Sequence, residues 1–469
     1  MFGTSGIRGA VGEDVTARLA LQLGRAVGSD ADVTRAVVGR DPRASGEPLV
    51  DALSAGFREL GVDVVSVGVA STPAIARAVG LRDADVGVAV TASHNPPADN
   101  GFKLWNPNGQ AYRARQREAV TRRLHDESFD LVGAGEVGNE LEWDGAANAH
   151  RTAVLASVDR DPVGSGVDAV PRRGDDRGAD AGLGLDVVVD VGNGAGGVTA
   201  DVLADLGCHV ETLNAQPDGR FPGRPSEPTA ETCASLTALV GATDADLGIA
   251  HDGDADRMLA VDDRGRFVSG DDLLAVFARH AVETAARDDT GSRAPSVAVP
   301  VNTSRAVRAH LRAVGGDTLR TRVGDTYVAE AVTGDDVVFG GEPSGAWIWP
   351  DATLCPDGPL AAARLAALIA ERPLSERVDD VPTFPILRDS VAVDADAKTA
   401  IVDRVADAAA AEYDGRSTLD GVRVDVEDGW FLVRASGTQP LIRLTAEGET
   451  RADAEALLEA ARALLDAAR

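Results

Sequence analysis

One pattern, a strand followed by a polar loop, a helix and a second strand, occurs three times along the 469-residue chain. The strands are expected at 36–39 and 62–67, 185–191 and 208–213, and 296–301 and 318–322, and the helices at 47–60, 198–206 and 305–314. Glycine follows each helix, where a left-handed residue commonly ends helical structure. Strands that alternate with helices form βαβ units and mainly parallel sheets, so we predict three similar α/β domains with mixed or parallel sheets.

The C-terminal region follows a different pattern. Apolar and polar residues alternate over 422–426 and 430–434, another strand follows at 441–446, and 451–468 has the spacing of an amphipathic helix. This order predicts a smaller α+β domain. The expected domains are 1–145, 146–247, 248–375 and 376–469, with a flexible surface insertion at about 161–182 that is rich in Gly, Asp and Arg.

The charge balance limits the possible partners. Asp and Glu number 75 against 46 Lys and Arg, so the formal net charge is −29. This acidity argues against nucleic acids and anionic membranes as partners. The chain has no apolar run of about 18 residues, no signal-peptide pattern at its start and three scattered cysteines. We therefore predict a cytoplasmic protein.

Lysine is nearly absent, since it occurs only at Lys103 and Lys398. Diffuse acidity with little lysine is typical of proteins from salt-loving organisms, and a GC-rich genome would also favour this composition. In either case Lys103 is notable, because an amine is a cation whose pKa can be lowered into a working range, which arginine cannot offer.

Three alternating carboxylates, Asp252, Asp254 and Asp256, lie between the expected strands 247–250 and 258–261. Oxygen ligands of this kind favour Mg²⁺ or Ca²⁺. An EF-hand is excluded, because its sixth loop position requires glycine and is Arg257 here. A solvated acidic turn remains an alternative in so acidic a chain.

Ser93 and His94 follow the apolar run 85–90 in the loop Thr91–Pro97. Open α/β sheets bind ligands at this end of a strand. The Gly-x-Ser-x-Gly pattern of hydrolases is absent, and adjacent residues on an extended chain point in opposite directions. The alternative is an ordinary polar loop.

Arg434, Ser436, Gly437 and Thr438 form a short loop sequence, and Arg443 follows it. Arginine binds phosphate with two parallel hydrogen bonds, and backbone N–H groups beside a glycine can form an anion nest. The spacing favours a phosphate site, although a capped turn would look similar.

The segment Gly341–Gly345 contains Glu342 and Ser344, a carboxylate and a hydroxyl that could bind sugar hydroxyls. Alone this signal is weak, because Glu342 could also be an ordinary turn residue.

The segment Gly192–Gly197 matches G-x-G-x-x-G between a strand and a helix, with Glu211 nineteen residues after Gly192. This is the context of a dinucleotide-binding fingerprint. The match supports an NAD-linked oxidoreductase as an alternative function. The simpler interpretation is a tight strand-to-helix turn.

Taken in order, these motifs resemble the α-D-phosphohexomutase superfamily of phosphoglucomutases, phosphomannomutases and phosphoglucosamine mutases. The resemblance covers essentially the whole chain and rests on 2–9 (FGTSGIRG), 91–103, 252–257, 323–330, 341–345 and 434–440. It implies three α/β domains with a smaller C-terminal domain. It also implies interconversion of hexose or hexosamine 1-phosphate and 6-phosphate through a phosphoserine enzyme and a bisphosphate intermediate.

The resemblance further implies a role for each reacting group. Ser93 would carry the phosphoryl group, and Mg²⁺ would be held by Asp252, Asp254, Asp256 and a Ser93 phosphate oxygen. Lys103 would be the general acid and base. Arg8 and Arg257 would add positive charge beside the reacting phosphate, and His94 would orient or polarise the serine.

The remaining roles concern the substrate. Arg434, Ser436, Gly437, Thr438 and Arg443 would hold the non-reacting phosphate, Glu342 and Ser344 would bind the sugar, and a sugar bisphosphate would act as activator. Ala346 replaces a histidine that many members have at this position, which leaves the sugar open. A non-catalytic relative that binds a small-molecule phosphosugar is the second alternative to an enzyme.

Overall fold

The computed structural model describes residues 2–3, 6–158, 182–288, 294–437 and 440–469. The predicted insertion at 161–182 therefore lies outside the described residues, apart from its last residue. Contacts within the chain divide it into two compact units, Met1–Leu273 with Ser344–Asp379, and Leu274–Pro343 with Asp380–Arg469. Among the described residues, no helix has both the length and the apolar character needed to cross a membrane.

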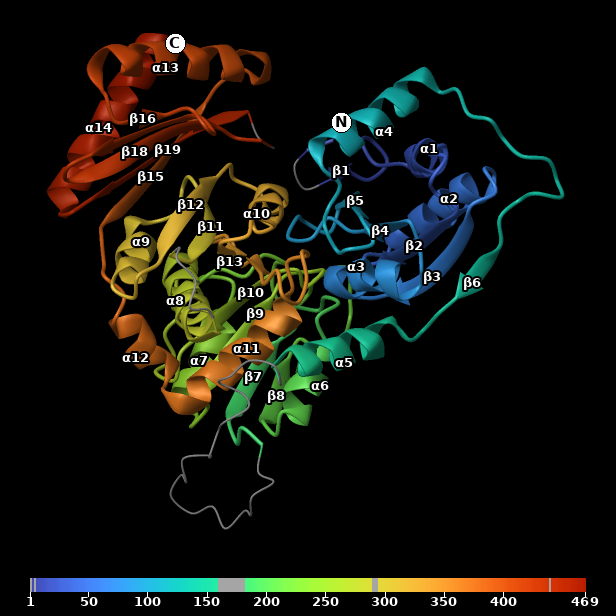
Figure 1. Cartoon of the computed structure of the whole chain (residues 1–469), viewed down its shortest axis with the longest axis horizontal. Coiled ribbons are helices and arrows are strands. Elements are labelled where there is room, and N and C mark those ends of the chain that lie inside the picture. The colour runs from blue at the N-terminus through green and yellow to red at the C-terminus, as the bar shows by residue number, and fades with distance from the viewer. Residues whose placement is uncertain (1, 4–5, 159–181, 289–293, 438–439) are drawn as a thin grey trace. The chain divides into compact units, whose positions relative to one another are not determined.

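The first unit begins with a mixed six-stranded sheet in the order β1-β5-β4-β2-β3-β6 (Figure 1). Its strands are β1 (Ile7–Ala10), β2 (Arg35–Arg40), β3 (Asp63–Val69), β4 (Val86–Val90), β5 (Asp99–Trp105) and β6 (Glu140–Glu142). Its helices are α1 (Ala17–Gly28), α2 (Gly46–Arg58), α3 (Thr72–Leu81) and α4 (Ala114–Asp126). The central strands are parallel, and β5 runs antiparallel to both β1 and β4.

Successive residues of β2 lie in different cores, because side chains alternate across a strand. Val38 packs with Leu53 of α2 in one core, and Val37 packs with Ile75 of α3 in the other. The sheet is thus the middle of three layers, with α1, α2 and α4 on one face and α3 on the other. The predicted βαβ unit is confirmed.

The second sheet of this unit has the order β10-β9-β7-β8, with β7, β8 and β9 parallel and β10 antiparallel. Its strands are β7 (Asp186–Asp190), β8 (His209–Leu213), β9 (Leu247–His251) and β10 (Met258–Val261). The unit also contains α5 (Ala146–Val158), α6 (Val198–Asp205), α7 (Ala234–Ala242), β14 (Trp347–Ile348), α11 (Gly358–Glu371) and α12 (Leu374–Asp379). The acidic loop lies between β9 and β10 and so belongs to this sheet, whereas the predicted boundary at 247/248 assigns it to the third domain.

The second unit contains a parallel arrangement in which β11 pairs with both β12 and β13. Its elements are β11 (Ser296–Pro300), α9 (Arg305–Arg312), β12 (Asp317–Thr321), α10 (Asp325–Ala331) and β13 (Val337–Gly341), preceded by α8 (Gly270–Asp288), which begins in the first unit. This is the third predicted βαβ unit.

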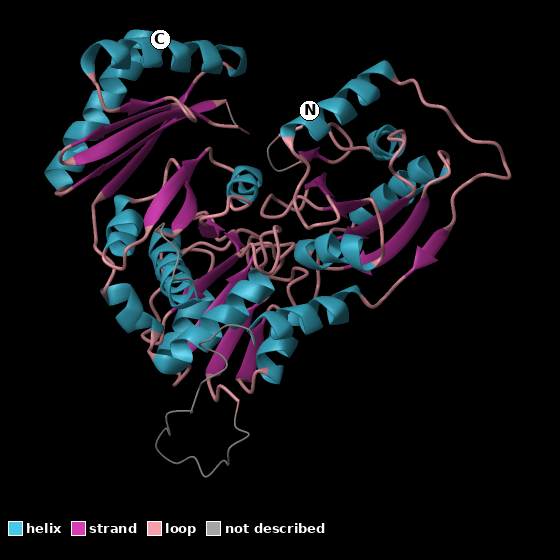
Figure 2. Ribbon diagram, viewed as in Figure 1, coloured by secondary structure: helices cyan, strands magenta, loops and turns pink. Residues whose placement is uncertain are grey.

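The C-terminal part is a five-stranded antiparallel sheet in the order β15-β19-β18-β17-β16. Its strands are β15 (Ile386–Ala392), β16 (Arg416–Ser417), β17 (Val422–Val426), β18 (Gly429–Ala435) and β19 (Leu441–Gly448). A short 3₁₀ turn (Ala395–Ala397), α13 (Lys398–Glu412) and α14 (Arg451–Ala468) complete it. Both helices lie on one face of the sheet (Figure 2), where Val405 and Leu465 pack against Phe431. The fold class of three α/β domains and a smaller α+β domain is confirmed.

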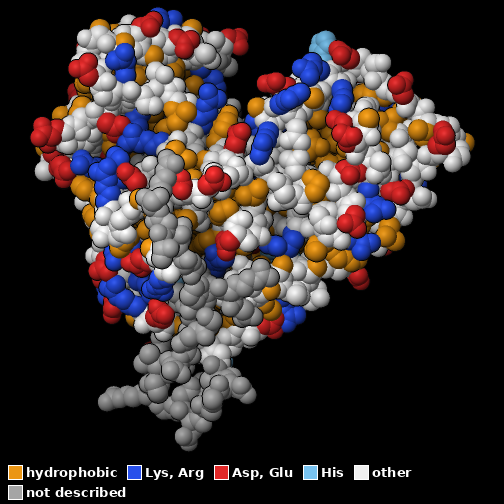
Figure 3. Space-filling model, in the orientation of Figure 1, with side chains coloured by type: hydrophobic (Ala, Val, Ile, Leu, Met, Phe, Trp, Pro, Cys, Tyr) orange, Lys and Arg blue, Asp and Glu red, His pale blue; other side chains and the backbone are white. Residues whose placement is uncertain are grey.

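Figure 3 shows acidic side chains scattered over the visible face rather than gathered in one patch.

Candidate functional site

Ser93 lies in the loop that leaves the C-terminal end of β4 and is 1% exposed. Its φ of +52° is in the left-handed region, which is uncommon for a residue other than glycine. The Ser93 N–H donates to the Thr91 hydroxyl at 2.8 Å, and this bond fixes the turn. Strained backbone of this kind persists only where the surroundings hold it, and it clusters at functional sites.

The Ser93 hydroxyl donates to Asp252 Oδ2 at 2.6 Å and lies 3.4 Å from His94 Nδ1. The positive charge of Arg257, together with burial and the charges of Arg8 and Lys103, lowers the pKa of His94. The imidazole is therefore neutral near pH 7, and it can orient a hydroxyl without adding charge.

Asp252, Asp254 and Asp256 are all buried between β9 and β10, and their ligand oxygens lie within 4.8 Å of one another. Burial raises the pKa of Asp252, and the neighbouring Asp254 and Asp256 raise it further. Asp254 Oδ1 is buried and has no hydrogen-bond partner within the described part of the chain. Three converging carboxylates, one with an unused oxygen, fit a hard divalent cation such as Mg²⁺.

Lys103 reaches the same carboxylates from β5, where it pairs with Ala89 of β4. Its amine donates to Asp254 Oδ2 at 2.8 Å and also to Asp256 Oδ2. Although burial alone would raise the pKa of Asp254, Lys103 holds it below its ordinary value. The amine of Lys103 is thus among the catalytic candidates.

Two arginines lie near these groups, and their positive charges contribute to the lowered pKa of His94. Arg8 is in β1 opposite Gly101, and its Nε is buried without a hydrogen-bond partner among the described residues. The backbone N–H of Arg257 donates to Asp252 Oδ1 at 3.2 Å. The structure therefore brings the predicted reacting residues together. Ser93, Lys103 and the three aspartates are buried, whereas Arg8, His94 and Arg257 are half-buried.

Arg43 is a site residue that the sequence did not identify. It is fully buried, and its Nε donates to Asp41 at 3.0 Å. Its other four N–H groups reach main-chain carbonyls of the serine loop and the start of β5: Ser93 and Asp99 at 3.0 Å, Asn95 at 2.7 Å, and Pro96. All five guanidinium donors are used, so Arg43 holds the backbone that presents Ser93.

Thr72, at the first turn of α3, is a second residue that the sequence did not identify. Its hydroxyl donates to Asp254 Oδ2 at 2.6 Å, and its backbone N–H donates to the Asp254 carbonyl at 2.9 Å. It therefore fixes the middle carboxylate of the acidic loop. The only available sequence signal was the helix start at Ser71–Pro73.

The glycine loop 192–197 supports the acidic loop. Ala195 N–H donates to the Gly253 carbonyl at 3.0 Å, and a Cβ added to Gly194 would lie 2.7 Å from that oxygen. At the end of β9, His251 bonds Thr199 at 2.8 Å and the Arg257 carbonyl at 2.9 Å. Close approach of the two backbones explains why this loop contains glycines. The contacts therefore favour the interpretation of the loop as a tight strand-to-helix turn.

The predicted phosphate loop lies in the second unit, between β18 and β19. Arg434 is opposite Arg443 in the strand register, and its guanidinium lies 3.6 Å from Asp420. Ser436 is 3% exposed, and its carbonyl accepts a hydrogen bond from Lys398 at 2.7 Å. Apart from its chain neighbours, no described residue has a heavy atom within 4 Å of a Cβ position at Gly437. Thr438 lies outside the described residues.

Glu342 also belongs to the second unit, where its carboxylate accepts from the Gly324 N–H at 2.7 Å. Ser344 belongs to the first unit, in the segment that continues to Gly345, whose carbonyl accepts from Met258 N–H at 3.0 Å. That segment borders the acidic loop through the bridge between Arg257 and Ala346.

Comparison with protein families matches the chain to four models in order. They are described as phosphoglucomutase/phosphomannomutase α/β/α domain I, domain II, domain III and the C-terminal domain, and they match residues 1–131, 173–265, 269–384 and 390–464.

Individual relatives extend over nearly the whole chain. A probable phosphoglucosamine mutase of Methanopyrus kandleri is 42% identical over 460 residues, which is 97% of this chain and 95% of the relative. Another, of Methanothermobacter thermautotrophicus, is 41% identical and covers 99% of this chain and 98% of the relative. The prediction of a salt-loving source is not supported, because these relatives come from methanogens.

Solved structures share the fold. A phosphoglucomutase/phosphomannomutase family protein of Burkholderia thailandensis superposes with a TM-score of 0.82 and 29% identity, covering 100% of this chain and 98% of that one. An Aspergillus fumigatus N-acetylphosphoglucosamine mutase, solved with GlcNAc-6P and magnesium, superposes with a TM-score of 0.59 and 16% identity, covering 100% and 95%.

Proposed function

The chain belongs to the phosphoglucomutase/phosphomannomutase family and is a hexose or hexosamine phosphate mutase, and we propose that Ser93 is its phosphoryl carrier. The observation that supports this role most strongly is the 2.6 Å hydrogen bond from the Ser93 hydroxyl to Asp252, within a buried cluster of carboxylates and cations. A phosphohexomutase is an isomerase, so the NAD-linked oxidoreductase and the non-catalytic relative are set aside.

In the proposed reaction, phosphorylated Ser93 donates its phosphoryl group to a free hydroxyl of the sugar phosphate. The P–Oγ bond of Ser93 breaks and a P–O bond to the sugar forms. The Lys103 ammonium group donates a proton to the departing Ser93 Oγ, which becomes a hydroxyl, and takes up the proton of the sugar hydroxyl. The resulting bisphosphate turns around in the site and returns its other phosphoryl group to Ser93, while Lys103 takes up the proton of the Ser93 hydroxyl and donates a proton to the departing sugar oxygen. Arg8 and Arg257 lower the barrier by placing positive charge beside the transferring group.

Asp252, Asp254 and Asp256 would hold Mg²⁺ together with a phosphate oxygen on Ser93, and the ion would neutralise charge on the transferring group. Thr72 and Lys103 keep Asp254 in place. The Asp252 carboxylate orients the Ser93 hydroxyl when the serine is not phosphorylated. His94, neutral and 3.4 Å from the hydroxyl, is an orienting partner rather than the base.

For the substrate, we propose a hexosamine phosphate, since the relatives at 41–42% identity are named probable phosphoglucosamine mutases. Arg434, Ser436, Gly437, Thr438 and Arg443 would hold the non-reacting phosphate, and Glu342 and Ser344 would bind sugar hydroxyls. A sugar bisphosphate would prime the enzyme by phosphorylating Ser93. A cytoplasmic location stays a prediction.

The phosphoserine role is tested by Ser93→Ala, with the exposed Ser390→Ala as matched control. We expect Ser93→Ala to lose more than about 10³-fold in turnover with an unchanged unfolding temperature, and Ser390→Ala to behave like the parent protein. Incubation with glucose 1,6-bisphosphate should add one phosphate, mapped to Ser93 by mass spectrometry. Full activity of Ser93→Ala would exclude the carrier role.

The sugar is tested separately with glucosamine, glucose, mannose and pentose 1-phosphates, each with Mg²⁺ and a bisphosphate primer. We expect the highest kcat/KM with glucosamine 1-phosphate. A higher value for mannose or glucose 1-phosphate would contradict the hexosamine assignment but leave the mutase chemistry intact.

A further inference from the structure

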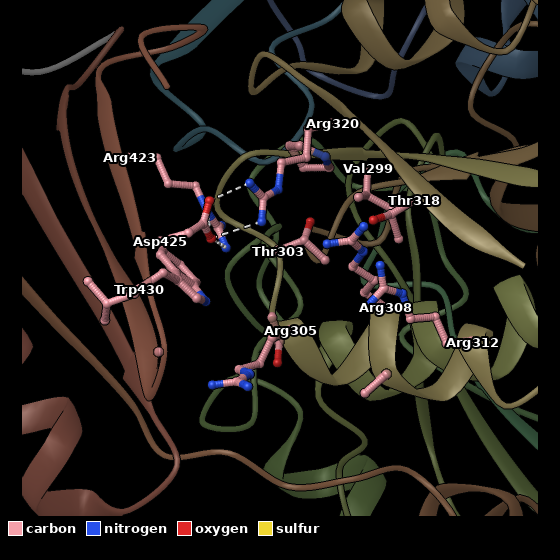
Figure 4. A pocket seen from close by; sticks show the side chains of 15 residues that line it. Val299, Thr303, Arg305, Arg308, Arg312, Thr318, Arg320, Arg423, Asp425 and Trp430 are labelled. Carbon is pink, nitrogen blue, oxygen red and sulfur yellow. Dashed lines mark hydrogen bonds and ion pairs between the residues drawn. The ribbon is translucent and has the colours of Figure 1, made fainter. Parts of the chain in front are cut away.

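The second unit contains a polar pocket of about 510 Å³ between the α9 region and the C-terminal sheet (Figure 4). Five arginines line it together with a single carboxylate, Asp425; the arginines are Arg305, Arg308, Arg312, Arg320 and Arg423. The C-terminal end of β11 and the start of α9 form one wall, and the β17–β18 hairpin forms another.

The pocket is locally basic in a chain that is strongly acidic overall. Besides Asp425, the acidic partners of these arginines are Asp317, which pairs with Arg308 and Arg312, and Glu449, which pairs with Arg305. A fourth carboxylate, the buried Glu447, accepts a hydrogen bond from the Arg305 backbone N–H at 2.8 Å. Four carboxylates therefore face five guanidinium groups. A surplus of positive charge at one concave site attracts anions, although the chain as a whole carries −29.

The arginines keep unused donor capacity. Arg320 binds Asp425 through two nitrogens at 2.6 and 3.0 Å, and Arg308 binds Asp317 in the same way at 2.6 and 3.0 Å. A guanidinium group has five N–H donors, so each of these pairs occupies only two of them. The paired carboxylates also hold the guanidinium groups in fixed orientations.

Thr303 supplies an independent indication of a ligand. The residue is 6% exposed and lines the pocket, and its hydroxyl is buried without a hydrogen-bond partner within the described part of the chain. Arg305 Nη1 is also buried without a hydrogen-bond partner among the described residues, although the guanidinium group lies over the Phe384 ring at 4.7 Å from its centroid. Figure 4 shows Thr303 among the arginines. Buried polar groups are nearly always paired, so an unpaired hydroxyl and an unpaired guanidinium N–H in one pocket point to a missing partner.

This pocket is separate from the predicted phosphate loop. The pocket is lined at Gly429 and Trp430, where β18 begins, whereas the phosphate loop starts at Arg434 near the end of the same strand. At about 3.3 Å per residue, Gly429 and Arg434 are about 16 Å apart along the strand. The pocket comes nearer to the loop at Arg423, which pairs with Leu432, two residues before Arg434. None of the predicted catalytic or substrate-binding residues lines the pocket.

We propose that this pocket is a second anion site, which binds the phosphate group of a small molecule. Several guanidinium forks suit the oxygens of a phosphate group, which accept two parallel N–H bonds from one arginine. Thr303 would donate its hydroxyl hydrogen to a phosphate oxygen, and Arg305 and Arg308 would contribute unused N–H groups. Inorganic phosphate and an organic phosphate share this chemistry.

The test is calorimetric titration of the full-length protein with inorganic phosphate and, separately, with glucose 6-phosphate, at constant chloride concentration. The pocket variants are Arg308→Gln and Thr303→Val, and Arg404→Gln on α13 is the matched control outside the pocket. We expect two sites in the parent and in Arg404→Gln, with affinity at one site reduced about tenfold in Arg308→Gln and less in Thr303→Val. Mutase kinetics without added phosphate should be unchanged in all three variants.

The source of the phosphate follows from the two titrations. If glucose 6-phosphate binds the pocket more tightly than inorganic phosphate, the ligand is an organic phosphate, and the reverse order indicates inorganic phosphate. Identical isotherms for Arg308→Gln, Thr303→Val and the parent would overturn the proposal. A raised KM for the hexose phosphate in Arg308→Gln would also overturn it, because the pocket would then be part of the substrate site.

Discussion

Replacing Arg43 tests whether the serine loop depends on a single buried guanidinium. Arg43→Lys keeps the charge but offers three donors from one atom, whereas the native side chain uses five donors to reach Asp41 and four main-chain carbonyls. At least two of these acceptors must lose their partner. The backbone of Ser93, which is held at a φ of +52°, is then free to relax.

The size of the effect follows from the lost bonds. Each buried acceptor left unsatisfied costs about 1–3 kcal/mol, and the partly buried carbonyls belong at the low end, so Arg43→Lys should destabilise the first unit by about 2–4 kcal/mol. Arg43→Met should cost about 3–5 kcal/mol, because it leaves the fully buried Asp41 without its cation. A displacement of Ser93 by about 1 Å would lower kcat about 100-fold.

The assay is steady-state mutase kinetics at a temperature where every variant is folded, with thermal unfolding measured in parallel. Arg220 provides a matched control, because it pairs with Asp218 two residues earlier, as Arg43 does with Asp41, but its side chain is 84% exposed. We expect Arg220→Lys to match the parent. In Arg43→Lys, kcat should fall with little change in KM, since the described guanidinium bonds of Arg43 position the loop that carries Ser93.

Two results would refute this reasoning. If Arg43→Lys kept the parent's kcat and unfolding temperature, the carbonyl bonds would be dispensable. If it lost stability but kept full kcat while folded, Arg43 would support the fold without positioning Ser93.

Three further predictions concern the metal, the phosphate loop and the thiols. Chelation with EDTA should abolish turnover, Mg²⁺ should restore it, and Asp254→Asn should require at least about tenfold more Mg²⁺; activity that survives chelation would contradict a metal at this site. Lys398→Met should raise KM for the sugar phosphate about tenfold with a smaller change in kcat, because Ser436 loses a charge-assisted bond; an unchanged KM would contradict this. Burial raises the pKa of Cys208 to about 12. At pH 8, Cys208 in the folded protein should therefore react with iodoacetamide about 10²–10³ times more slowly than an unperturbed cysteine thiol, and its reaction rate should still rise with pH above 9. Rapid alkylation of Cys208 at pH 8 would show that the thiol is accessible.

Much of the fold and several site residues could be predicted from local sequence, because the signals involved are local. Side-chain periodicity and terminal glycines locate the three βαβ units, and the alternating carboxylates of Asp252–Asp256 can converge within one short loop. The rarity of lysine drew attention to Lys103, which the structure places against those carboxylates.

The tertiary structure decided which of these signals belong together and added residues that the sequence could not reveal. The segment Gly192–Gly197 has the same local pattern whether it binds a dinucleotide or supports a neighbouring loop, and only its contact with Gly253 distinguishes the two. Thr72 lies 182 residues from Asp254 in sequence. Arg43 binds carbonyls 50 to 56 residues away. Main-chain carbonyls are the same in every residue, so a side chain that acts by binding them leaves no signature at its partner's position, and only the folded chain identifies the pair.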